Sequence, residues 1–331
     1  MMDTSIAQSL EVAGQNARYD NCAKSIIGYK AISAWILKTC TKEFANCDVK
    51  YIAEHCISDV LVSKKAVHQD HLSGDSKITS LNSESTSINE GTIRYDVRFK
   101  ALAPGQEEPI GLIINIEIQN DDSPSCAITN RAEYYCSRMI SEQYGTVFSE
   151  GNYQDLQKVY SIWICPDPAK KRQNSIVRFP RTMETVYGKA PFSEKDFDKS
   201  EYIVIFVGKL DDSNDNQIID LLYTLFSNDM SVEEKKDRLS SVYKIEMTRE
   251  IESEVYNMCN LSRGIDLAGY ERGVGVGFDK GISIGAMQTL IQLVQEGDLT
   301  LNRAAQKAGM SAEEFLKKKV EYEKERQKMK Y

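Results

Sequence analysis

Two segments of the chain alternate apolar and polar residues with a period of two, which predicts half-buried β-strands. In the segment 94–99, one face would carry Tyr95, Val97 and Phe99, and the other Arg94, Asp96 and Arg98. In the segment 113–119, one face would carry Ile114, Ile116 and Ile118, and the other Asn115, Glu117 and Gln119. Pro104-Gly105 lies between the two segments and predicts a hairpin turn. We therefore expect the two polar faces to lie side by side.

The remaining periodicity predicts further strands and helices, with a change of character near residue 210. A helix is expected over 21–46, a polar loop over 68–91, a helix over 130–143, and buried strands over 158–165 and 202–208. Beyond Asp211 the strand pattern stops, and helices are expected over 216–227, 231–240, 247–259 and onward to the end. We therefore expect an α/β domain over 1–210 and a helical accessory region over 211–331.

Composition and charge narrow the class of protein. The 331 residues are 41% hydrophobic and 27% charged, as in ordinary globular proteins. No apolar run is long enough for a membrane span, and the first ten residues lack an export signal, so a cytoplasmic location without a membrane partner is expected. The eight cysteines form no Cys-x-x-Cys pair and are expected to be reduced. The net charge of −8 argues against a bulk nucleic-acid binder, although local basic patches remain.

The two adjacent polar faces point to a metal site. The carboxylates of Asp96 and Glu117 and the amide of Gln119 would face the same space. Oxygen ligands of this kind suit a hard divalent cation such as Mg²⁺ or Mn²⁺. The alternative is an ordinary solvent-facing strand surface, which is common in antiparallel sheets.

Around these strands the chain resembles the PD-(D/E)XK nuclease superfamily, in its transposase-like or recombination-promoting branch. The resemblance runs with gaps from about Tyr19 to the C-terminal helices. The matching segments are Tyr95-Asp96-Val97, Ile116-Glu117-Ile118-Gln119, Arg131 with Tyr134-Tyr135, 153–164 and 258–262. The resemblance implies a restriction-endonuclease-like α/β core, in which helices flank a mixed central sheet, followed by a C-terminal helical region.

The same resemblance implies a metal-dependent DNA endonuclease that acts in DNA recombination or transposition. Asp96, Glu117 and the main-chain carbonyl of Ile118 would be the metal ligands. Gln119 stands where most of the superfamily has a catalytic lysine. A glutamine at that position can form hydrogen bonds but carries no charge. A catalytically inactive DNA-binding or protein-interaction protein that retains the fold is the alternative, and RNA is a further alternative for the substrate.

Several other residues have both a functional and a purely structural interpretation. Arg131 and Tyr134 could brace the site or contact a phosphate, but ordinary ion pairing and packing are equally reasonable. The basic run Lys170, Lys171 and Arg172 could contact DNA phosphates or form a solvated surface. The resemblance also implies an acidic residue on the first helix. Glu43 is the candidate, with a surface position as its alternative, and Lys24 on the same helix has no stronger support.

The helical region has two further features. Glycines recur every four residues at Gly269, Gly273, Gly277, Gly281 and Gly285. Each weakens a helix by about 1 kcal/mol relative to alanine. We therefore expect this stripe, residues 269–285, to pack against a second helix, as in a homodimer. Near residues 300–325 two helices separated by Gly309 resemble a helix-turn-helix DNA-binding motif, with an ordinary helical hairpin as the alternative.

Overall fold

The computed structural model describes residues 16–62, 84–87, 91–105, 108–120, 127–209 and 216–328. Within these ranges only the backbone is described for 58–62, 84–87, 91–94, 262–283 and 322–328. The chain divides into two compact units, Met1–Arg263 and Gly264–Tyr331. No helix among the described residues is both long and apolar enough to cross a membrane.

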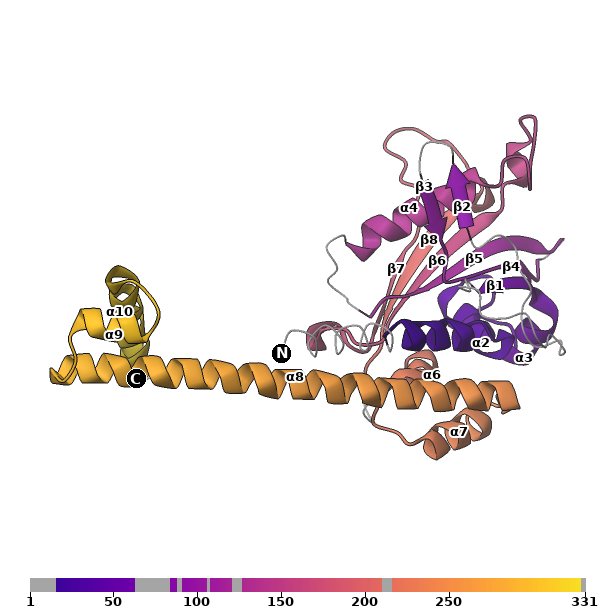
Figure 1. Cartoon of the computed structure of the whole chain (residues 1–331). Coiled ribbons are helices and arrows are strands. Elements are labelled where there is room, and N and C mark those ends of the chain that lie inside the picture. Colours follow the sequence, from indigo (N-terminus) through magenta and orange to yellow (C-terminus); the bar gives the residue numbers. More distant parts are fainter. Residues whose placement is uncertain are drawn as a thin grey trace. The chain divides into compact units, whose positions relative to one another are not determined.

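A six-stranded mixed sheet forms the centre of the first unit (Figure 1). Its strands, in spatial order, are β1 (Ile57–Val62), β4 (Val97–Ala103), β5 (Ile110–Ile118), β6 (Lys158–Cys165), β8 (Ser200–Phe206) and β7 (Ser175–Phe179). The three central strands β5, β6 and β8 are parallel, and each outer pair is antiparallel. Val97 on β4 pairs with Ile116 on β5, which confirms the predicted hairpin.

Helices cover both faces of this sheet (Figure 1). On one face α2 (Lys30–Cys40) and α6 (Gln217–Phe226) pack against alternate strand residues, including Ile114 and Ile116 of β5. On the other face α4 (Ile128–Ser141) packs against Ile113 and Val159. Every residue of β6 is buried because both faces of this central strand are covered.

Shorter elements complete the first unit. They are a helical stretch over 16–27, α3 (Val49–Tyr51), η1 (Ile52–Cys56), η2 (Tyr153–Asp155), η3 (Lys170–Arg172), α5 (Glu194–Phe197) and α7 (Val232–Ser241). A separate hairpin joins β2 (Glu84–Ser87) to β3 (Gly91–Arg94). Part of the predicted polar loop over 68–91 is therefore a strand, and residues 68–83 and 88–90 lie outside the described residues.

Two predicted details of the first unit are wrong. Tyr95 does not share a face with Val97 and Phe99, because Asp96 lies in a bend and the alternation begins only at Val97. Tyr95 packs instead on the α4 side of the sheet. The single helix predicted over 21–46 is interrupted at Gly28-Tyr29 and ends at Cys40.

The long helix α8 (Arg249–Glu296) begins in the first unit and continues into the second. Its first turns, through Ile251, Val255 and Met258, belong to the same apolar core as α6 and the sheet. The two units consequently divide at Arg263, later than residue 210. The expected division into an α/β domain over 1–210 and a helical accessory region over 211–331 stays a prediction.

The second unit has a small apolar core of its own. The end of α8, α9 (Leu301–Lys307) and α10 (Ala312–Lys328) bury the side chains Ile291, Ala304, Ala305 and Phe315. Gly309 takes a positive φ of 68° in the turn between α9 and α10, a conformation that favours glycine. The Glu314 amide donates to the Ser311 hydroxyl, while the Glu314 carboxylate accepts from the Ser311 amide, so a capping box opens α10. A DNA-binding role for this helix pair stays a prediction.

The backbone is helical throughout the glycine stripe, as expected. The side-chain environment of Gly269, Gly273, Gly277 and Gly281 lies outside the described part of the chain. A methyl group in place of the Gly285 hydrogen would meet no described atom within 4 Å beyond its own stretch of helix. Packing of this stripe against a second helix, and hence a homodimer, stays a prediction.

Candidate active site

Asp96 and Glu117 are adjacent at the carboxyl ends of the parallel strands. Asp96 directly precedes β4, and Glu117 is the second-last residue of β5. The antiparallel pairing of these strands brings the two carboxylates together. The Asp96 amide donates to Glu117 Oε1 at 3.1 Å, and the Ile118 amide donates to Asp96 Oδ2 at 3.0 Å. The backbone of each strand therefore fixes the carboxylate of the other.

Both carboxylates are poorly solvated. Glu117 is only 4% exposed, and the Asp96 side chain is 14% exposed. Burial raises the pKa of Glu117 well above its ordinary value, and the negative charge of Asp96 raises it further. Burial also raises the pKa of Asp96, although the Lys24 ammonium acts in the opposite direction. The ionised forms of these carboxyl groups are therefore disfavoured in the metal-free protein, and a bound cation would stabilise them.

A lysine from the first helical stretch contacts this pair. Lys24 Nζ lies 2.8 Å from Asp96 Oδ1 and 2.5 Å from Asp20 Oδ2, one helical turn earlier. Burial disfavours the ammonium, but the charges and hydrogen bonds of Asp96 and Asp20 outweigh it and raise the pKa of Lys24 to about 12. Nothing in the sequence favours Lys24 over Glu43. Only the packing of residues 16–27 against the sheet reveals Asp20 and Lys24.

Gln119 is held in place by its neighbours immediately after β5. The backbone N–H of Gln119 donates to the Ile164 carbonyl of β6 at 2.8 Å. The side-chain Oε1 of Gln119 accepts from Arg131 Nη1 at 2.6 Å. The Arg131 guanidinium lies over the Trp163 ring, 4.6 Å from its centroid, and 5.9 Å from the Tyr135 ring centroid. Arg131 thus braces Gln119 from α4 and is itself positioned by two aromatic rings.

Of the two neighbouring tyrosines on α4, Tyr135 rather than Tyr134 contacts Arg131 in this arrangement. Burial raises the pKa of the Tyr135 hydroxyl, and the charge of Glu117 raises it further, which places this ring in the electrostatic field of the site. Tyr134 is 44% exposed. The alternation of apolar positions along α4 does not separate these neighbours, because both fit an aromatic position beside a sheet.

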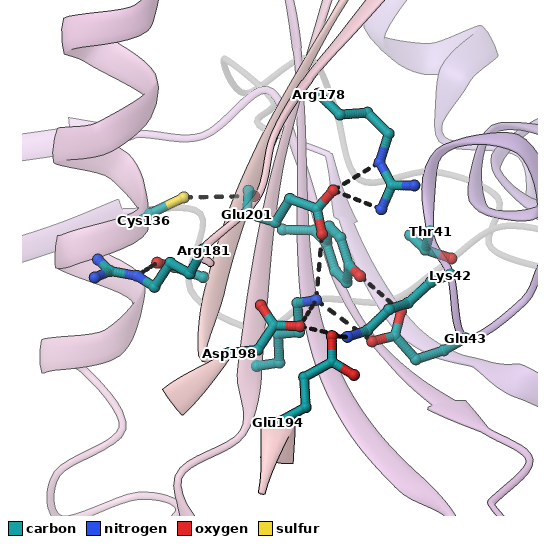
Figure 2. A network of polar contacts seen from close by, with 12 residues as sticks. Thr41, Lys42, Glu43, Cys136, Arg178, Arg181, Glu194, Asp198 and Glu201 are labelled. Atoms are coloured by element: carbon teal, nitrogen blue, oxygen red, sulfur yellow. Dashed lines mark hydrogen bonds and ion pairs between the residues drawn. The ribbon is translucent and has the colours of Figure 1, made fainter. Parts of the chain in front are cut away.

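Both predicted locations of Glu43 are wrong, because this residue belongs to a second polar network at the opposite end of the parallel strands (Figure 2). Its side chain is 6% exposed, so it is not a surface residue. Glu43 accepts a hydrogen bond from the Tyr160 hydroxyl at 2.7 Å and lies 3.6 Å from Lys158 Nζ. Tyr160 and Lys158 stand at the beginning of β6, whereas Glu117 is near the end of β5.

Buried charges dominate this second network. Lys158 Nζ lies 2.7 Å from Asp198 and 3.2 Å from Glu201, and Glu201 also pairs with Arg178 at 2.6 Å. Lys42 bridges Asp198 and the more exposed Glu194 in the same network (Figure 2). These contacts join the starts of β6 and β8. Arg178, downstream of the 170–172 run, is thus explained by its ion pair with Glu201 and needs no contact with a substrate.

The basic run itself follows the carboxyl end of β6, the same end of the parallel strands that carries Asp96 and Glu117. Residues Lys170, Lys171 and Arg172 form η3, which follows the carboxyl end of β6, and β6 is the neighbour of β5. Lys170 and Lys171 are exposed, while the Arg172 guanidinium lies 5.6 Å from the centroid of Phe206 at the end of β8. Strand topology therefore brings η3 and Gln119 to the same edge of the sheet.

The donor atoms of the carboxylate pair fit a hard divalent ion. Within the described residues no group of three or more His, Cys, Asp or Glu side chains could hold a metal. A site built on Asp96 and Glu117 would need main-chain, water and phosphate oxygens to complete its coordination, as Mg²⁺ sites commonly do. The buried and mutually repelling carboxylates are consistent with such a site. PD-(D/E)XK nucleases generally use divalent metals.

Comparison with known proteins gives a family for this chain. A family model described as PD-(D/E)XK nuclease family transposase matches residues 53–254, a segment that contains Asp96, Glu117 and Gln119 but begins after Lys24. No curated protein and no solved structure gave a match. The family match confirms the resemblance seen in the sequence, and the sheet flanked by helices confirms the restriction-endonuclease-like fold. Because the match covers more than half of the chain, this protein belongs to the PD-(D/E)XK nuclease family transposases.

Proposed function

We propose that this protein is a metal-dependent DNA endonuclease that hydrolyses phosphodiester bonds during DNA recombination or transposition. The observation that carries the proposal is the reciprocal backbone pairing of Asp96 and Glu117, which holds two buried carboxylates together. Holding two repelling charges in a poorly solvated place costs stability. Such an arrangement is typical of a site that binds a cation.

Phosphodiester cleavage requires charge neutralisation and an activated water. Asp96, Glu117 and the main-chain carbonyl of Ile118 would hold Mg²⁺ or Mn²⁺. The bound ion would polarise the phosphoryl oxygen and lower the pKa of a coordinated water. Gln119, fixed by Arg131, would orient the attacking water through a hydrogen bond. The uncharged Gln119 adds no positive charge of its own.

The DNA backbone would extend from this site towards η3. Lys170 and Lys171 are exposed at the same sheet edge, where their ammonium groups would contact phosphates. Arg131 and Tyr134 are further proposed contacts, with Arg131 acting mainly through Gln119. RNA would present the same phosphate chemistry and is the alternative substrate.

Cleavage of supercoiled plasmid tests the proposed activity. Wild-type protein with Mg²⁺ or Mn²⁺ should nick or linearise the plasmid, and EDTA should abolish cleavage. Glu117→Ala should reduce cleavage by at least about 100-fold because a metal ligand is lost. Glu133→Ala, which removes an exposed carboxylate from α4, should cleave like wild type. Cleavage that persists with EDTA and in Glu117→Ala would reveal a contaminant.

Binding without cleavage under every divalent ion would favour the catalytically inactive alternative. The endonuclease and the inactive DNA-binding protein would share a DNA contact surface. The affinity for DNA is therefore measured separately from cleavage, in EDTA. Lys170→Ala/Lys171→Ala should weaken DNA binding and make the logarithm of affinity less dependent on salt, by roughly 1 to 2 units of slope. Lys195→Ala, an exposed lysine on α5 near the start of β8, is the matched control. Equal effects of both substitutions would contradict a binding surface at η3.

A further inference from the structure

Lys24 occupies the oxygen of Asp96 that a cation would need. The two carboxylate oxygens of Asp96 have different partners. Oδ2 accepts the Ile118 amide and is thereby tied to the end of β5. Oδ1 contacts the Lys24 ammonium at 2.8 Å. A divalent ion held by Asp96 through Oδ1 would therefore compete directly with Lys24.

Asp20 gives Lys24 a second partner on its own helix. Asp20 Oδ2 lies 2.5 Å from Lys24 Nζ, with the spacing of one helical turn. The Asp20 side chain is 37% exposed, compared with 14% for Asp96. Losing Asp96 would thus leave the ammonium paired with Asp20, next to the carboxylate pair, instead of stranded without a counter-charge.

Arg131, the other cation described beside the site, is less able to change partners. Its Nη1 donates to Gln119 at 2.6 Å, and its guanidinium lies over Trp163. Lys24 has a flexible stem and a compact ammonium that can rotate between acceptors. A phosphate entering the site adds negative charge beside Lys24, and phosphoryl transfer is accelerated by positive charge placed there.

We propose that Lys24 is a catalytic residue. Its ammonium leaves Asp96 Oδ1 and then contacts the scissile phosphate. Asp96 holds Lys24 while no divalent ion is bound. Once Asp96 Oδ1 binds the ion, Lys24 stays on Asp20 and turns its ammonium to the phosphate. This inference rests on the proposed nuclease function, and it assigns to the first helix the positive charge that Gln119 lacks.

Metal binding without DNA provides the first test. Mn²⁺ affinity is measured by electron paramagnetic resonance for wild type, Lys24→Met and Lys30→Met. Lys24→Met should bind Mn²⁺ about tenfold more tightly, because the competing ammonium is gone from Asp96. Lys30→Met, at the first residue of α2, should bind Mn²⁺ like wild type. Unchanged or weaker binding by Lys24→Met would overturn the competition.

Single-turnover cleavage at saturating Mn²⁺ provides the second test. Lys24→Met should cleave about 100-fold more slowly although its metal site is full, whereas Lys24→Arg should retain an intermediate rate. Asp20→Asn should slow cleavage by about tenfold, because Lys24 loses its second partner. Lys30→Met should cleave at the wild-type rate.

The combined outcomes separate the roles that Lys24 could have. Tighter Mn²⁺ binding with unchanged cleavage would make Lys24 a counter-charge only and would overturn its catalytic role. Loss of both properties with a lower melting temperature would indicate a structural ion pair and would also overturn it. If wild type shows no cleavage with any divalent ion, the proposed function fails and takes this inference with it. Normal wild-type cleavage with an unaffected Lys24→Met overturns only the inference.

Discussion

Glu117 shows at the scale of one residue how a site conflicts with the stability of its fold. It is 4% exposed on a central strand, a position that suits an apolar side chain. Burial and the charge of Asp96 both raise the pKa of Glu117. A raised pKa in the folded state means that this group favours folding at low pH, where it is protonated in both states. That contribution is lost as the pH rises through the folded-state pKa.

Neutralising this carboxylate should therefore stabilise the metal-free protein at neutral pH. Glu117→Gln keeps an oxygen that can accept the Asp96 amide but removes the buried charge. We expect a gain of about 1 kcal/mol, or roughly 2–4 °C in Tm, measured by thermal unfolding at pH 7 in EDTA. The gain should shrink at pH 4, where Glu117 is already protonated.

Two controls accompany this measurement. Glu133→Gln alters an exposed carboxylate on α4 and should leave the Tm unchanged. Added Mn²⁺ should raise the Tm of wild type more than that of Glu117→Gln, because ligands that bind the folded state stabilise it. A lower Tm for Glu117→Gln in EDTA would show that the charged form stabilises the fold.

At the scale of elements, the second polar network fixes the starts of β6 and β8. Lys158 is 7% exposed and lies within 3.6 Å of three carboxylates, on Glu43, Asp198 and Glu201. Glu43 follows α2, Lys158 and Glu201 lie on β6 and β8, and Asp198 lies between α5 and β8. Desolvated charges of this kind contribute little net stability as a set, but each is costly to leave without its partner.

Lys158→Met should consequently destabilise the protein by about 3–5 kcal/mol, because the buried carboxylate of Glu201 and its neighbours lose their shared cation. Urea unfolding measures the loss. Lys42→Met is the matched control: the Lys42 side chain is 38% exposed, and its removal should cost no more than about 1 kcal/mol. Equal losses for the two variants would contradict a special role for the buried lysine.

The elements predicted from the sequence were those with local patterns. The alternation around Glu117 predicted β5, and Pro104-Gly105 predicted its hairpin with β4. The bend at Asp96 was missed because alternation continues through it in the sequence. The positions of Lys24 and Glu43 could not be predicted from a local pattern either. Asp20 and Lys24 look like an ordinary pair one helical turn apart, and Glu43 meets Lys158 only through packing between distant segments.

At the scale of the whole molecule, the two units have separate cores. The core of the first unit joins the sheet, α2, α6 and the start of α8. The core of the second unit joins the end of α8, α9 and α10 around Phe315. Among the residues whose side chains the structure describes, no buried residue of the second core belongs to the first. A small unit of this size has limited stability of its own, so damage to its core should remain local.

Phe315→Ala tests whether the units unfold independently. Phe315 is fully buried, and its truncation should cost about 3–5 kcal/mol in the second unit. Hydrogen exchange should accelerate in α9 and α10, while β5 and β6 keep wild-type protection. Leu316→Ala, at the 47% exposed neighbouring position, should change neither region. Loss of protection in the sheet together with α10 would show instead that the two cores unfold as one cooperative unit.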